Sequence, residues 1–241
     1  IPNGMAFNND GTKLYISGNS NDTIYQYALT TAYDVSTGSY ESKSFSVATQ
    51  LTGPCGLAFN TSGTKMYVQD FNADTVFQYS LSTAFDVSTA SYDSVSLDAS
   101  GQDTSTQAMV FKPDGTSLFI AGNTNDTVYQ YDLTTAFDLS TASYASKSFN
   151  ASTQVTTAAG IGFTDSGTKM YVLDASDQDI HQYTLTTAYD VSTASYASAS
   201  FDTTSQDSSA FGMVFKPDGT KLYVVGRTND AVFQYETTSL A

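Results

Sequence analysis

Phenylalanine recurs along this chain at a constant spacing. Phe7, Phe59, Phe111, Phe163 and Phe215 each lie 52 residues after the one before. The motif "NDTVYQY" of residues 125–131 also keeps this register, with counterparts in the other copies. A fixed period of this size indicates one supersecondary unit used several times. The sequence therefore divides into four full copies and a truncated fifth: residues 7–58, 59–110, 111–162, 163–214 and 215–241.

Each full copy carries four strand signals. In the first copy a short apolar run, "GMAF" (residues 4–7), leads into an Asn-Asp-Gly turn that suits the positive φ of a hairpin. The segments "TKLYISG" (12–18) and "DTIYQYAL" (22–29) predict the second and third strands. "TTAYDVSTGSY" (30–40) predicts a structured turn, because its Asp-x-Ser-Thr centre favours bonds from side chain to backbone. A fourth strand follows, and no segment keeps a helical apolar spacing for three turns, so the chain is predicted to be all-β.

The second and third strands are apolar on both faces. Leu14 and Ile16 point one way and Tyr15 the other, so each small sheet needs cover on both sides. Sheets stacked around an axis supply that cover, and a 52-residue repeat is close to the roughly 40 to 50 residues of a propeller blade. We therefore predict one five-bladed β-propeller over residues 1–241, with an open β-solenoid as the alternative. The last blade is expected to lack its outermost strand, to close the ring by packing against the first blade, and to offer an unpaired edge for self-association.

One segment carries a family resemblance. "FKPDGTKLYVVGRTNDAVFQY" (215–235) resembles the YVTN/TolB-like propeller repeats, and the likeness covers the first three strands of every copy. "LTTAFDLSTASYASKSF" (133–149) is similar to repeats in uncharacterised proteins of marine bacteria and their phages. The resemblance implies the propeller fold. Enzymes of the YVTN-like group, such as lactonases, use seven blades, so five repeats argue against that activity here.

The charge balance excludes some partners. Nine Lys and Arg stand against 24 Asp and Glu, and the net charge of −15 repels nucleic acid and anionic membrane surfaces. No apolar run approaches the ~18 residues that span a bilayer. A surface rich in Ser, Thr, Asn and Asp is typical of an extracellular or particle-surface protein, which is the localisation we expect. Four glycosylation sequons occur, at Asn21, Asn60, Asn125 and Asn150.

Residues that carry catalytic chemistry are scarce. The single histidine, His181, stands where other copies have Tyr or Phe, so we expect a ring stacked between blades. Cys55 is the only cysteine and is expected to be a small buried residue, without a disulfide. We therefore predict a protein that is not an enzyme and has no catalytic residues, metal site or required cofactor. Calcium is left open for the Asp-rich loops 70–75 and 174–179.

The loops after the second strand are where the copies disagree. Phe71 and Arg227, the only arginine, have no counterpart in the other copies, and Asp70 and Asp174 end the second strand in alternate copies. Segments on the same face carry four glutamines, Gln50, Gln102, Gln154 and Gln206. These residues predict a binding site for a glycan or a protein at the channel mouth, with Phe71 as a stacking platform. The predicted function is a non-catalytic binding or structural module of a secreted, surface-appendage or phage particle assembly. The alternative is a five-bladed glycoside hydrolase or lyase that uses Asp at the channel mouth.

Overall fold

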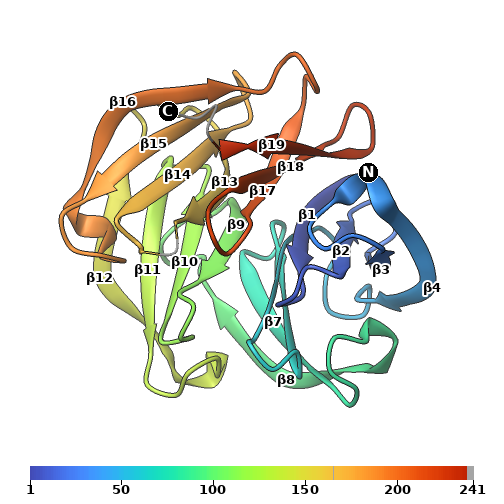
Figure 1. The fold of residues 1–241 in the computed structure, drawn as a ribbon. Helices are drawn as coiled ribbons and strands as arrows, with labels where there is room; N and C mark the ends of the chain where they lie inside the picture. Colours follow the sequence, from blue (N-terminus) through green and yellow to red (C-terminus); the bar gives the residue numbers. More distant parts are fainter. Residues whose placement is uncertain (165, 238–241) are drawn as a thin grey trace.

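The fold is described from a computed structural model, over residues 1–164 and 166–237. All strands in this part of the chain belong to five antiparallel sheets that follow one another around a central axis (Figure 1). Four sheets have four strands and the last has three. The predicted five-bladed β-propeller, with an incomplete last blade, is therefore confirmed.

Within each blade the strands are in chain order from the axis outward. The first blade consists of β1 (Pro2–Phe7), β2 (Lys13–Gly18), β3 (Thr23–Leu29) and β4 (Gly38–Ser46). The second consists of β5 (Pro54–Phe59), β6 (Lys65–Asp70), β7 (Thr75–Leu81) and β8 (Ala90–Asp98). The third consists of β9 (Thr106–Phe111), β10 (Ser117–Gly122), β11 (Thr127–Leu133) and β12 (Ala142–Asn150). The fourth consists of β13 (Ala158–Phe163), β14 (Lys169–Asp174), β15 (Asp179–Leu185) and β16 (Ala194–Asp202). The fifth consists of β17 (Ala210–Phe215), β18 (Lys221–Gly226) and β19 (Ala231–Glu236).

The segment between the third and fourth strands is a short 3-10 helix, in place of the turn expected from its sequence. The four helices are η1 (Val35–Thr37), η2 (Val87–Thr89), η3 (Leu139–Thr141) and η4 (Val191–Thr193). In η1 the Asp34 side chain accepts hydrogen bonds from the Ser36 amide (3.1 Å) and the Ser36 hydroxyl (2.6 Å). The local bonds predicted for Asp-x-Ser-Thr are thus present, and they cap one helical turn. The described residues contain no helix with the length and apolar character that crossing a membrane requires.

The hairpin turns and the 3-10 segments dock on each other. Gly63, in the turn between β5 and β6, has φ +69°, and a Cβ added there would lie 2.2 Å from the Phe85 ring. Phe85 is itself in the left-handed region (φ 59°), and its amide donates to the Gly63 carbonyl (2.9 Å). The same contact joins Gly11 to Tyr33, Gly115 to Phe137 and Gly167 to Tyr189. Only glycine meets both demands at this turn, the positive φ and the close approach of a ring.

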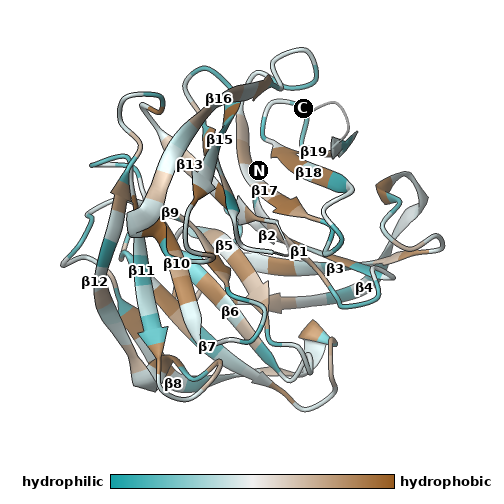
Figure 2. Ribbon diagram, turned by 60° about the vertical axis from the view of Figure 1, so that its left-hand side comes forward, coloured by the Kyte–Doolittle hydropathy of each residue, from teal (hydrophilic) through white to brown (hydrophobic). Residues whose placement is uncertain are grey.

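The core lies between the blades, as alternation on both faces of the strands requires. Between the first two blades, Tyr15 and Ile24 pack with Met66, Val68 and Tyr79, all of them fully buried. Apolar bands run along the strands of neighbouring blades (Figure 2). Side-chain hydrogen bonds also join neighbouring blades at equivalent positions of the repeat. The Tyr15 hydroxyl donates to the Phe85 carbonyl (2.7 Å), and the Gln26 side chain accepts from the Val87 amide (3.0 Å).

The ring closes by packing of the fifth blade on the first. β1 contacts both β17 and β18, and the chain's amino terminus lies beside the fifth blade (Figure 1). Tyr223 of β18 donates its hydroxyl to the Tyr33 carbonyl (2.6 Å), which repeats the Tyr15 bond across the closure. The Phe7 and Tyr223 rings pack with centroids 4.6 Å apart. No strand is exchanged between these blades among the described residues, as predicted.

Candidate functional site

The innermost strands surround a narrow central channel. A ring of five apolar side chains, one from each blade, lines two pockets along it: Met5, Leu57, Met109, Ile161 and Met213. Below this ring is a pocket of about 250 Å³. Its walls include the five repeating phenylalanines, Phe7, Phe59, Phe111, Phe163 and Phe215. Above the ring the space is only about 20 Å³. The first pocket is lined mainly by the ends of the innermost strands and the second by their beginnings, and the ring of five side chains is common to both.

The upper mouth of the channel lies where the innermost strands begin. Arg227, the only arginine in the sequence, lies near this mouth. Arg227 follows β18, and its Nη2 donates to the Asn3 Oδ1 of β1 (2.5 Å). Its guanidinium carbon lies 3.1 Å from the centre of the Phe211 ring of β17. Asn3 in turn donates to the Pro54 carbonyl of the second blade (3.2 Å). The arginine is thus held at the point where the first, second and fifth blades meet.

The environment of Arg227 is unusual for a cation. Burial lowers the pKa of its guanidinium to about 10, and its Nε has no hydrogen-bond partner among the described residues. Other buried side-chain atoms without a hydrogen-bond partner among the described residues lie near Cys55, on the second and third blades. They are both side-chain ends of Gln69 and the Thr106 hydroxyl.

Cys55 lines the same upper pocket but is poorly suited to attack a substrate. Only 3% of it is exposed, and its Sγ lies 3.5 Å from the Gln69 carbonyl oxygen and 3.7 Å from that of Thr106. Burial raises the pKa of the thiol well above its ordinary value. Because the thiolate is the reactive form, this environment keeps Cys55 inert.

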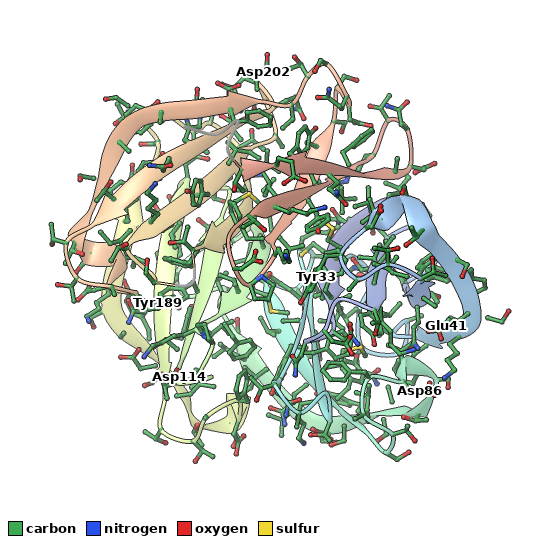
Figure 3. The ribbon with its side chains drawn as sticks, viewed as in Figure 1. Tyr33, Glu41, Asp86, Asp114, Tyr189 and Asp202 are labelled. Carbon is green, nitrogen blue, oxygen red and sulfur yellow. The ribbon has the colours of Figure 1, made fainter. Side chains whose placement is uncertain are left out.

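Asp70 and Asp174 are each 1% exposed and cap backbone amides. The Asp70 carboxylate accepts from the amides of Thr52 (2.9 Å) and Asn72 (2.8 Å). Asp174 accepts the equivalent bonds in the fourth blade. Neither residue lines a channel pocket. Figure 3 likewise places Glu41, Asp86 and Asp202 at the periphery of the ring.

The third and fifth blades obtain the same capping carboxylate from another position. There Asp103 and Asp207, from the loop that precedes the innermost strand, accept from the amides of Thr124 (3.1 Å) and Thr228 (3.2 Å). A Cβ added at Gly122 would lie 2.3 Å from the Asp103 carboxyl carbon, so glycine ends the second strand in these blades. The second and fourth blades carry an aliphatic residue in the loop and Asp on the strand. The sequence alternates between Gly and Asp at the end of the second strand because the capping carboxylate comes from the strand in some blades and from the preceding loop in others.

The other predicted ligand residues lie apart from Arg227. Phe71 packs its ring over Gly53 of the second blade. Three of the glutamines accept from tyrosine hydroxyls of the third strands: Gln50 from Tyr79, Gln102 from Tyr131 and Gln206 from Tyr235. Gln154 is half-buried. None of the predicted set lines either channel pocket, but Arg227 contacts Asn3 and Phe211, which directly precede Gly4 and Gly212 of the upper pocket. Sequence reasoning did not single out its partners Asn3 and Phe211, because neither residue type signals chemistry.

The four sequons differ in accessibility. Asn21, Asn125 and Asn150 are exposed, whereas Asn60 is half-buried and accepts a bond from the Lys65 amide (3.0 Å). Asn21 donates to the Tyr25 hydroxyl and Asn150 to the Asn125 carbonyl (3.0 Å). Glycosylation of any of them stays a prediction.

The described residues thus form a five-bladed β-propeller in which a half-buried arginine lies where the first, second and fifth blades meet. The sequence model of the lactonase family, described as a seven-bladed β-propeller, matches residues 1–240. The chain therefore belongs to the lactonase family. No protein with a curated description matches it.

Several solved structures share the fold. A protein of unknown function from Desulfotomaculum acetoxidans DSM 771 is 13% identical, with a TM-score of 0.57 over 100% of this chain and 67% of its own. A candidate 6-phosphogluconolactonase from Bacteroides uniformis ATCC 8492 is 16% identical, with a TM-score of 0.57 over 96% of this chain and 65% of its own. The nidogen/laminin complex matches at 12% identity and a TM-score of 0.61, over 100% of this chain and 78% of that one. The chain thus spans about two thirds of the first two, and identities this low show the fold alone.

The family match corrects one prediction. The chain was expected not to be an enzyme, partly because lactonases have seven blades, and membership of the lactonase family overturns that expectation. The reasoning failed because blade number does not determine chemistry. Blades are repeated units that can be added or removed, whereas a site at the channel mouth needs only a few loops. The family model spans the five blades present here.

Proposed function

We propose that this protein is a hydrolase that opens small cyclic esters at the upper mouth of the channel. The observation that carries the proposal is the placement of Arg227, held by Asn3 and stacked on Phe211, with a buried Nε that has no partner among the described residues. Family membership supports the class of substrate, because it is the lactonase family.

The reaction needs a group that stabilises negative charge on the carbonyl oxygen. Water adds to the ester carbon and loses a proton to solvent, and the tetrahedral intermediate carries an oxyanion. As the oxyanion collapses, the ring C–O bond breaks and the leaving oxygen takes up a proton from solvent, which gives a hydroxy acid. A fixed, partly desolvated cation stabilises the oxyanion more than the neutral ester, which lowers the barrier. In this proposal the N–H groups of Arg227 bind the oxyanion, and Asn3 fixes the orientation of the guanidinium plane.

An uncharged lactone is favoured over a phosphorylated one. The chain carries a net charge of −15, which repels a phosphate dianion at long range. Phosphate recognition also calls for several cationic groups, and Arg227 is the only arginine. Asp70 and Asp174, the residues of the alternative glycosidase prediction, already accept backbone bonds, which favours ester over glycoside chemistry.

The test is a hydrolysis assay by pH-stat on δ-valerolactone, δ-gluconolactone and 6-phosphogluconolactone. We expect acceleration of the two uncharged lactones over buffer, and a loss of about 10²–10³-fold in kcat for Arg227→Met. Arg227→Lys should recover part of the rate, because lysine keeps the charge but not the fork of donors.

The matched control is Lys147→Met. Lys147 pairs with Asp190 on the outer part of the ring (2.8 Å), so its loss should leave kcat unchanged. Circular dichroism checks that each variant is folded. A folded wild-type protein without turnover of any of the three lactones refutes the proposal, as does an Arg227→Met variant with the wild-type rate.

A further inference from the structure

The fourth blade departs from the repeat at three positions that lie together in space. Asp177 stands where the other blades have Asn or Ala, and Asp179 where they have Thr or Ala. His181, the only histidine, stands where they have Tyr or Phe. Residues 179 and 181 share one face of β15, because side chains two apart on a strand point the same way. Asp177 reaches them from the preceding loop.

The three side chains converge. One ligand atom from each of Asp177, Asp179 and His181 lies within 4.8 Å of the other two. His181 is 7% exposed, and neither of its ring nitrogens has a hydrogen-bond partner among the described residues. A buried imidazole with both nitrogens unpartnered is a costly arrangement for a neutral or a charged ring. It points to a partner that the protein chain does not supply.

The first and third blades satisfy this place with neutral groups. In the third blade Asn125 donates to the Tyr129 hydroxyl (3.4 Å), and in the first blade Asn21 donates to the Tyr25 hydroxyl. The fourth blade replaces this amide and phenol by a carboxylate and an imidazole that are not hydrogen-bonded to each other in the described structure. The substitutions therefore removed a direct bond and brought together groups that bind a cation.

The charge around the cluster also favours a cation. Asp179 of β15 is directly opposite Asp202 of β16, whereas Thr23 of the first blade is opposite Ser46. Like charges in opposed positions of a sheet are destabilising. Within residues 1–164 and 166–237, no lysine, arginine or amino terminus forms a salt bridge with Asp177 or Asp179. The cluster thus has excess negative charge and no cationic side chain to offset it.

We propose that Asp177, Asp179 and His181 form a binding site for a divalent transition-metal ion of the Zn²⁺ type. Imidazole with carboxylates suits Zn²⁺, Co²⁺ or Ni²⁺, whereas Ca²⁺ prefers oxygen ligands only. Ligand bonds of about 2.0–2.2 Å require the ligand atoms to lie about 3.3–3.6 Å apart in a tetrahedron. Asp177 is exposed, and its Oδ1 accepts from the Asp179 amide (3.0 Å), so its other carboxylate oxygen is the one that can bind the ion, and solvent can supply the fourth ligand.

The experiment uses the untagged chain, stripped of metal with EDTA, and titrates Zn²⁺ by calorimetry. We expect one equivalent to bind, and ¹⁵N-histidine labelling to give one imidazole signal that shifts with the same stoichiometry, because the chain has one histidine. His181→Phe, which restores the residue of the second and fifth blades, should lower the affinity at least tenfold. Asp179→Thr should do the same, and Ca²⁺ should not shift the signal.

Asp98→Asn is the matched control. This exposed carboxylate of the second blade lies outside the cluster, so Zn²⁺ binding should be unchanged. An imidazole signal that stoichiometric Zn²⁺ does not move overturns the proposal. Binding of equal affinity in the folded His181→Phe variant overturns it as well.

Discussion

The carboxylate that caps the loop after the second strand comes from the strand in some blades and from the preceding loop in others, and this can be tested by moving it from one position to the other. In the second blade Leu51 occupies the loop position and Asp70 the strand position, while the third blade has Asp103 and Gly122 at these places. The double variant Leu51→Asp with Asp70→Gly converts the second blade to the pattern of the third. If a carboxylate at either position caps the same backbone amide, the double variant should lose less stability than the two single variants predict.

The magnitudes follow from the contacts. Asp70→Gly removes the acceptor of the Thr52 and Asn72 amides, at about 1–3 kcal/mol for each amide left unsatisfied. Leu51→Asp removes a fully buried leucine, at about 2–5 kcal/mol, and sets a second carboxylate beside Asp70. In the double variant the new carboxylate caps residue 72, as Asp103 caps Thr124. Its loss should be smaller than the sum of the single losses by at least about 2–3 kcal/mol.

The assay is urea denaturation of the four proteins of the cycle, followed by far-ultraviolet circular dichroism and tyrosine fluorescence, since the chain has no tryptophan. We expect a higher midpoint for the double variant than for either single variant. The reciprocal pair in the third blade, Asp103→Val with Gly122→Asp, provides an independent repeat. Losses that simply add, in both blades, would show that the two carboxylates are unrelated and refute the reasoning.

Three further outcomes are expected. Gly115→Ala should lower the free energy of unfolding by about 2–3 kcal/mol, because residue 115 has φ +74° and its Cβ would meet the Phe137 ring. Thermal melts measure this loss, and Gly101→Ala is the control, because a Cβ at residue 101 meets nothing within 4 Å. Burial raises the pKa of Asp93, but bonds from Lys65 (2.6 Å), Ser80 (2.6 Å) and Gln78 (2.9 Å) outweigh it, so the folded pKa lies below the ordinary 3.8. A carboxyl group whose pKa is lower in the folded than in the unfolded state stabilises the fold at pH values above its unfolded pKa, and this stabilisation is lost as the pH falls through the folded pKa. The free energy of unfolding of the wild type should therefore fall below about pH 4, and Asp93→Asn should reduce this fall. The same dependence of the free energy of unfolding on pH in both proteins would contradict this. β19 has no partner on its outer edge among the described residues, so we expect concentration-dependent association in sedimentation velocity that Val232→Lys weakens, and a monomer at all concentrations would count against it.

Much of the fold could be predicted because it rests on short-range patterns. The period of 52 residues, the Asp-Gly and Ser-Gly turns and the alternation on both faces of the strands each act within one copy, and together they require stacked blades. The structure confirms these features down to the three-stranded last blade. Among the candidate site residues, Arg227 was singled out because it is the only arginine, a property visible in the sequence, and its part in a site stays a prediction.

Tertiary structure decided what depends on contacts between copies. Arg227 meets Asn3 only because the ring closes, and 224 residues separate them in the chain. The sequence displayed the alternation of Gly and Asp, but only the fold shows that a loop carboxylate and a strand carboxylate reach the same amide. The physical reason is that a repeat specifies its own strands by local pattern, whereas a site between blades depends on the curvature that five packed sheets adopt together.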